Sequence, residues 1–111
     1  MSKTKKPRNT KTQTQNQSPF SDPGIRSPFE IGAHYLIRTV TMINTGTLVA
    51  EYPEFLVLNG AAWVADTGRF ADALKDPSRF GEVEPFPGQV IVGKGGIIDA
   101  CVIPGYTPTQ K

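Results

Sequence analysis

The chain has 111 residues, of which 38% are hydrophobic and 20% charged, and its formal net charge is +2. This length suits a single domain. No apolar stretch approaches the roughly 18 residues that a membrane span needs, and no apolar segment follows the basic N-terminus, so we expect neither an anchor nor a signal peptide. The single cysteine, Cys101, excludes an intrachain disulfide. Because it lies within an apolar run, we expect it to be buried in a protein of a reducing compartment.

Charge is unevenly distributed along the chain. Residues 1–28 carry six basic side chains and one acidic, a net charge of +5, whereas residues 29–111 carry six basic and nine acidic, a net charge of −3. The first segment is rich in Lys, Thr, Gln, Asn, Ser and Pro, which predicts a disordered basic arm. Such an arm is either a solubilising tail or a segment that orders on a polyanion or a neighbouring subunit. The phosphate contacts expected of it on nucleic acid are Lys3, Lys5, Lys6, Arg8 and Lys11.

Strand-like patterns begin after the arm and predict one domain over residues 29–106, followed by a short tail, 107–111. Residues 35–43 are β-branched and aromatic in alternation, which predicts a strand with Leu36, Val40 and Met42 on one face. Asn44-Thr45-Gly46 is typical of a hairpin loop leading to a second strand over residues 47–51.

A third strand is predicted from Phe55, and Asn59-Gly60 within it allows two topologies. The dipeptide is a strong hairpin signal, which would fold residues 61–64 back onto residues 55–58. Alternatively, one long strand bends at the glycine and serves both halves of a barrel. We favour the bent strand because it suits the spacing of the elements that follow.

The remaining elements are a short helix and two strands. The helix is predicted over residues 68–75, capped by Asp66 or Thr67 and ended by Asp76-Pro77, with Trp63 and Phe70 in the core around it. Residues 82–88 contain two prolines and predict a stiff turn. Residues 89–92 and 97–103 predict the last two strands, on either side of residues 93–96.

Two groups of segments resemble known proteins. Residues 45–49, 54–64 and 90–102 resemble the two motifs of the Sm-like (Hfq-type) family. This resemblance implies a mainly β fold: a small five-stranded SH3-like or Sm-like barrel, with the short helix inserted between strands 3 and 4. The nucleobase-contacting Asp and Asn of that family correspond to about Tyr52 to Phe55. Residues 37–41, 58–70 and 83–87 look like small uncharacterised proteins of tailed bacteriophages and prophages, which implies a viral setting.

The sequence contains few candidates for catalytic or metal-binding residues. His34 is the only histidine and suits a strand residue better than a metal ligand or a catalytic base. Gly93-Lys94-Gly95-Gly96 lacks the spacing of a phosphate loop and favours a turn, although Lys94 could hold a phosphate between subunits. The carboxylates around Asp66 and Glu84 suit a solvated surface better than acid–base or metal chemistry. We expect no catalytic residues, metal or cofactor.

These patterns favour a non-enzymatic, phage-type accessory protein. A domain of this size is marginally stable alone, so we expect homo-oligomers joined through the outer strands. The expected ligand is nucleic acid or a nucleotide, contacted by Arg38, Tyr52, Phe55 and Lys94. The alternative is a virion structural or assembly protein of the capsid or tail, whose arm orders on neighbouring subunits. The expected location is the host cytoplasm or the virion, without a membrane partner.

Overall fold

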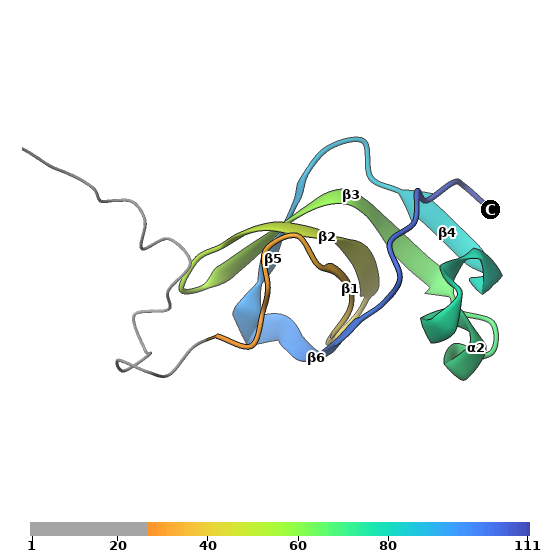
Figure 1. Ribbon diagram of the computed structural model, residues 1–111, viewed down its shortest axis with the longest axis horizontal. Helices are drawn as coiled ribbons and strands as arrows, with labels where there is room; N and C mark the ends of the chain where they lie inside the picture. The colour runs from red at the N-terminus through yellow and green to blue at the C-terminus, as the bar shows by residue number, and fades with distance from the viewer. Residues whose placement is uncertain (1–26) are drawn as a thin grey trace, which may run out of the picture.

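The computed structural model describes residues 27–111. The predicted disorder of the arm and its five expected phosphate contacts therefore lie outside the described residues. The described elements, in chain order, are β1 (His34–Thr39), β2 (Ile43–Glu51), β3 (Phe55–Asp66), α2 (Phe70–Lys75), the 3-10 turn η2 (Pro77–Arg79), β4 (Glu82–Pro85), β5 (Val90–Gly93), the 3-10 turn η3 (Lys94–Gly96) and β6 (Ile97–Val102) (Figure 1). No helix within residues 27–111 is long and apolar enough to cross a membrane.

The strands form one antiparallel sheet in the order β4-β3-β2-β1-β6, and β5 also pairs with β3. The prediction of a mainly β fold with one short helix is confirmed. The prediction of a closed five-stranded barrel is wrong, because the sheet has six strands and its pairing path is open. The additional strand is β4, in the segment read as a stiff turn. Pro85 ends this strand, where the lack of an amide hydrogen is tolerated.

A sharp bend in β3 allows this strand to pair with three others. Gly60 has a left-handed φ of 57°. Thr45 pairs with Ala62 and Thr47 with Asn59, so two residues of β3 lie opposite Gly46 alone, as in a β-bulge. The half of β3 before the bend pairs with β5 and the half after it pairs with β4. The interpretation of Asn59-Gly60 as a bend within one strand is confirmed.

The predicted hairpin at residues 44–46 is wrong. The chain reverses at residues 40–42, where the Thr39 amide donates to the Met42 carbonyl at 2.8 Å, and Gly46 lies inside β2. A Cβ atom at Gly46 would lie 2.9 Å from Cβ of Leu58, closer than real Cβ contacts. The glycine therefore permits close approach of β3 and does not form a turn. Val40, placed by the sequence on the face of Leu36, is 74% exposed in the true turn.

Hydrophobic side chains pack on both faces of the sheet. Leu36 and Ile37 are adjacent in β1, point to opposite faces and belong to different clusters. The first cluster consists of Tyr35, Ile37, Leu48, Leu56, Leu58, Ala61 and Val92. The second consists of Leu36, Ala62, Val64, Ala73, Phe80, Val83 and Ile103.

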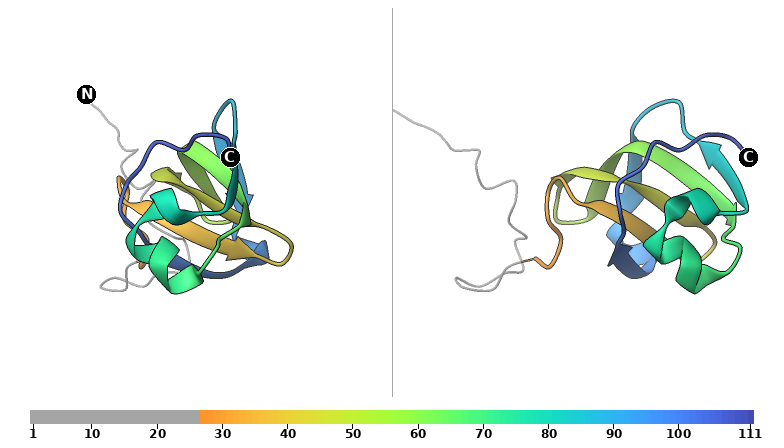
Figure 2. Two further views of the ribbon diagram at one scale, coloured as in Figure 1. Left: turned by 90° about the vertical axis from the view of Figure 1, so that its right-hand side faces the viewer. Right: turned by 45° about the vertical axis from the view of Figure 1, so that its right-hand side comes forward.

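The second cluster is covered by α2 and by the chain after β6 (Figure 2). The helix begins at Phe70, two residues later than predicted, and its N-cap position, Arg69, makes no capping hydrogen bond. Ala73 is its buried residue, and the 3-10 turn that follows brings Phe80 into the core. Trp63 and Phe70, predicted to lie in the core, remain 37% and 39% exposed. Ala62 and Val64 point into the second cluster, so Trp63 between them points to the other face of β3.

Candidate interaction surface

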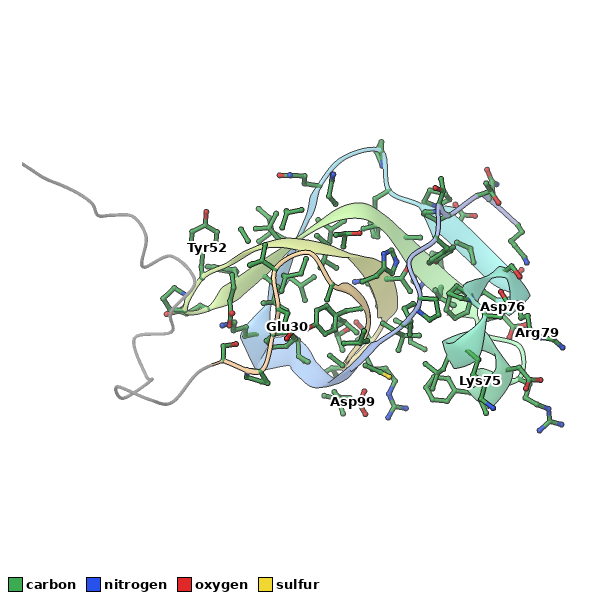
Figure 3. The ribbon with its side chains drawn as sticks, viewed as in Figure 1. Glu30, Tyr52, Lys75, Asp76, Arg79 and Asp99 are labelled. Atoms are coloured by element: carbon green, nitrogen blue, oxygen red, sulfur yellow. The ribbon has the colours of Figure 1, made fainter. Side chains whose placement is uncertain are left out.

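Three of the four predicted ligand contacts lie close together: Tyr52 and Phe55 flank the turn between β2 and β3, and Lys94 of η3 lies next to this turn. The Tyr52 amide donates to the Phe55 carbonyl at 2.8 Å, which closes the turn. Phe55 pairs with Gly93 of β5, and the Lys94 amide donates to the Glu54 carbonyl at 2.9 Å. The structure therefore brings Tyr52, Phe55 and Lys94 together. In Figure 3, Tyr52 lies at the opposite end of the molecule from Asp76 and Arg79.

An apolar patch covers the outer side of this end. Leu56 and Leu58 point into the first cluster, so Phe55 and Val57 point to the other face of β3. Val57 pairs with Ile91 of β5, which is 68% exposed. We call Tyr52, Phe55, Val57 and Ile91 the outer patch. Tyr52 and Phe55 are 45% and 46% exposed, so both rings offer a free face.

Lys94 does not present a free ammonium group in this arrangement. Its Nζ donates to Oε2 of Glu51 at 2.7 Å, and the Glu51 side chain is only 4% exposed. The same carboxylate oxygen accepts a hydrogen bond from Oγ of Ser27 at 2.6 Å. The surrounding glycines form the 3-10 turn between β5 and β6, which confirms the interpretation of residues 93–96 as a turn. The charge of Lys94 therefore compensates a buried carboxylate.

The first described residues lie at the same end of the molecule as the outer patch. Ser27 is tied to Glu51, the residue before Tyr52, and its hydroxyl also accepts from the Phe29 amide at 3.2 Å. The Phe29 ring packs edge-on against Tyr35, with 5.4 Å between ring centroids. Tyr35 is buried, so it serves the core. The basic arm therefore joins the folded domain at the end of the molecule that carries the exposed rings.

Arg38, the fourth predicted contact, lies at the opposite end of β2. It pairs with Ile43, the first residue of that nine-residue strand, whereas Tyr52 follows the last. At about 3.3 Å per residue the separation is roughly 25–30 Å. The Arg38 guanidinium makes a two-pronged ion pair with Asp99 of β6 and lies 5.7 Å from the centre of the Phe70 ring. The hydrogen bond to Asp99 raises the pKa of Arg38, and the same bond lowers the pKa of Asp99.

His34 is a buried residue of the sheet. Its Nδ1 lies 3.1 Å from Oγ1 of Thr47, its ring packs edge-on against Tyr106, and its buried Nε2 has no hydrogen-bond partner within residues 27–111. Burial lowers the pKa of His34 because the charged imidazolium would lose hydration.

Cys101 is exposed, which corrects its predicted burial. It lies in β6 opposite Leu36, and its thiol donates to the Val102 carbonyl at 3.4 Å. β6 is an outer strand, so an apolar run there does not ensure burial. The register places Cys101 two positions from His34, yet no hydrogen bond joins the two side chains in the described part of the chain.

The predicted acidic surface lies around β4. Asp66 pairs with Glu82 and Trp63 with Glu84 across the two strands, and Oδ1 of Asp66 accepts from the Gly68 amide at 2.8 Å. Among residues 27–111, no group of three or more His, Cys, Asp or Glu side chains is placed to hold a metal ion.

Two features of this surface were missed in the sequence. Ile91 and Val92 are adjacent apolar residues, and only alternation within β5 separates the exposed side chain from the buried one. Glu51 reads as a surface carboxylate, but it is buried against Lys94. The exposure of Ile91 could have been inferred from strand alternation in residues 90–92, because its neighbours on either side would face the core. Nothing in the sequence around Glu51 indicated its burial.

Comparisons with protein-family models, with curated proteins and with solved structures found no match for this chain.

Proposed function

We propose that the protein is a non-enzymatic binding module that forms homo-oligomers through its outer strands and binds nucleic acid or a nucleotide. The supporting observation is that the exposed rings of Tyr52 and Phe55 lie at the same end of the molecule as Ser27, which is bound to Glu51, the residue before Tyr52, and follows the basic arm. Aromatic faces stack on nucleobases, and clustered cations bind phosphates. The outer patch thus offers rings for base stacking, and the arm offers cations for phosphate binding, at one end of the molecule.

The outer patch and the arm contact different parts of the ligand in this proposal. Arg38 and Lys94 are already engaged in ion pairs with Asp99 and Glu51, so their role is structural. Glu54 is exposed in the turn between the two rings and repels phosphate. The bases therefore stack on Tyr52 and Phe55, and the phosphates contact the cations of the arm: Lys3, Lys5, Lys6, Arg8 and Lys11.

Fluorescence anisotropy of a labelled oligonucleotide with the full chain tests this division. Replacing Tyr52 and Phe55 by alanine should weaken binding about thirtyfold or more, because each of the two stacked bases contributes about 1–3 kcal/mol. Val40→Ala is the matched control, since Val40 is 74% exposed in a turn outside the patch. Equal affinity of the double variant and the control would contradict the role of the rings.

The arm is tested in the same assay by a salt titration. Replacing Lys5, Lys6 and Arg8 by glutamine should lower the dependence of log affinity on log salt by about two units, because about three phosphate contacts are lost. Lys75→Gln, which removes an exposed charge from α2, is the control. An unchanged salt dependence, or no binding even at low salt, would contradict the proposal.

We also infer the finer fold. Strands β1, β2, β3, β5 and β6 form a partly open version of the expected SH3-like or Sm-like barrel, to which β4 is added. Support comes from the bend at Gly60 and from the order β6-β1-β2-β3-β5 along the sheet.

A virion structural or assembly role is the second proposal. Within residues 27–111, β5 and β6 each pair along one edge only, and exposed Ile91, Ile98 and Val102 lie on these two strands. Unprotected apolar edges suit a subunit of a capsid or tail. Mass spectrometry of purified virions, compared with the host cytoplasm, tests this role: presence in particles supports it, and exclusive recovery from the cytoplasm contradicts it.

A further inference from the structure

Within residues 27–111, β6 pairs along one edge only, and its other edge presents an ordered set of backbone groups. The Ile103 amide donates to the His34 carbonyl at 2.9 Å, and the register continues with Leu36 opposite Cys101 and Arg38 opposite Asp99. In an antiparallel ladder, hydrogen-bonded pairs alternate with pairs that are not hydrogen-bonded. The amides and carbonyls of Asp99 and Cys101 therefore point to β1, and those of Ala100 and Val102 point away from the sheet.

Between Asp99 and Val102, this edge lacks the features that usually prevent strands from pairing with other chains. Natural edge strands carry lysines, prolines or inward-pointing charges. The one charged residue of β6 is Asp99, and its carboxylate is bound by Arg38. Ile98 and Val102 on the same strand are 65% and 60% exposed. The strand is therefore apolar, without net charge, and able to accept another strand.

We propose that β6 pairs antiparallel with β6 of a second copy of this chain, about a two-fold axis at Cys101. This pairing rests on the homo-oligomeric part of the proposed function and assigns its surface. Ala100 of each copy then lies opposite Val102 of the other, and these are the residues whose backbone groups point outward. An axis at Ala100 would instead use Ile98, which lies where the β1–β6 register shifts. The two-fold pairing occupies both β6 edges and closes at a dimer.

The side chains that would face each other across the two-fold axis favour self-pairing. Val102 lies beside Ala100 of the other copy, so a largely exposed apolar side chain gains a neighbour. Neither Ala100 nor Val102 carries a charge, and each Asp99 keeps its own Arg38, so no uncompensated like charges face each other. The two Cys101 residues form a pair that is not hydrogen-bonded, with their Cα atoms about 4.5 Å apart. That separation lies within the range of disulfides, about 4.4–6.8 Å.

The exposed thiol makes the pairing testable in the unmodified protein. Diamide accepts two electrons and two protons as two Cys101 thiols join in one disulfide, so a β6–β6 dimer should be converted to a covalent dimer. Sedimentation velocity of the full chain over a range of concentrations should show a reversible dimer. Val102→Lys should raise its dissociation constant at least tenfold and slow cross-linking to a similar degree. Val40→Lys places the same charge on an exposed valine outside β6 and should change neither. Thermal unfolding monitored by circular dichroism checks that both variants fold.

The other outcomes contradict the assignment in different ways. An oligomer that resists cross-linking, tolerates Val102→Lys and is broken by Ile91→Lys would place the interface on β5; the β6 pairing would be wrong while homo-oligomer formation stands. A monomer at all concentrations would contradict both, and would indicate that the edge is unused or is covered by the chain's own residues 1–26.

Discussion

Replacing Lys94 by methionine tests whether the buried carboxylate of Glu51 depends on its ammonium partner. The two groups lie 2.7 Å apart, and the side chains of Glu51 and Lys94 are 4% and 22% exposed. Removing one member of a buried pair costs about 3–5 kcal/mol, because the other charge stays buried without compensation. Lys94 keeps some contact with water, so we expect the lower end, about 3 kcal/mol. The free energy of unfolding of a small domain is about 5–10 kcal/mol, so the loss is a large fraction of it.

Urea unfolding at neutral pH, followed by circular dichroism, measures this loss. The double variant Glu51→Gln, Lys94→Met should regain most of the stability, because it buries no charge and keeps an acceptor for Ser27. Lys75→Met, at an exposed position of α2, should change stability by less than about 0.5 kcal/mol. A loss below about 1 kcal/mol in Lys94→Met, the size found for surface pairs, would refute this account of the pair.

Three further predictions concern the sheet. Gly46→Ala should destabilise the domain by about 1–3 kcal/mol in urea unfolding, because its Cβ would collide with β3, whereas Gly95→Ala, with open space around it, should be nearly neutral; equal effects would contradict the close approach. Tyr106→Phe should cost about 1 kcal/mol, since it removes the 2.8 Å hydrogen bond to the buried hydroxyl of Thr45, and an unchanged melting temperature would argue against that bond. Burial lowers the pKa of His34 below its ordinary 6.5, so its stabilising contribution is present above about pH 6.5 and is lost as the pH falls towards the folded-state pKa. Unfolding measured between about pH 7.5 and 4.5 should show this decline, and His34→Gln should flatten it.

The parts of the fold set by local signals were predictable. Gly60 marks the bend in β3 because its left-handed backbone favours glycine, and Asp76-Pro77 ends the helix where a proline removes an amide. Gly46 misled because the reason for a glycine there is tertiary: its neighbour Leu58 lies on another strand. The open sheet also escaped prediction, since the four-residue strand β4 is short and ends in proline.

The exposed rings of the candidate site could be predicted from the sequence, but the ion pairs that engage its cations could not. Tyr52 and Phe55 flank a proline-containing turn, where exposure is expected. Lys94 and Arg38 looked available for a ligand because their acidic partners, Glu51 and Asp99, lie 43 and 61 positions away in the sequence. Only the folded sheet brings such pairs together, and the ion pairs leave the cations of the arm as the expected phosphate contacts.

The mass of the full chain in solution, measured by sedimentation velocity with and without an oligonucleotide at low salt, tests the proposed function most directly. The account predicts a species heavier than one chain in the absence of nucleic acid, and a further increase in mass when the oligonucleotide is added. A single-chain mass under both conditions would contradict it.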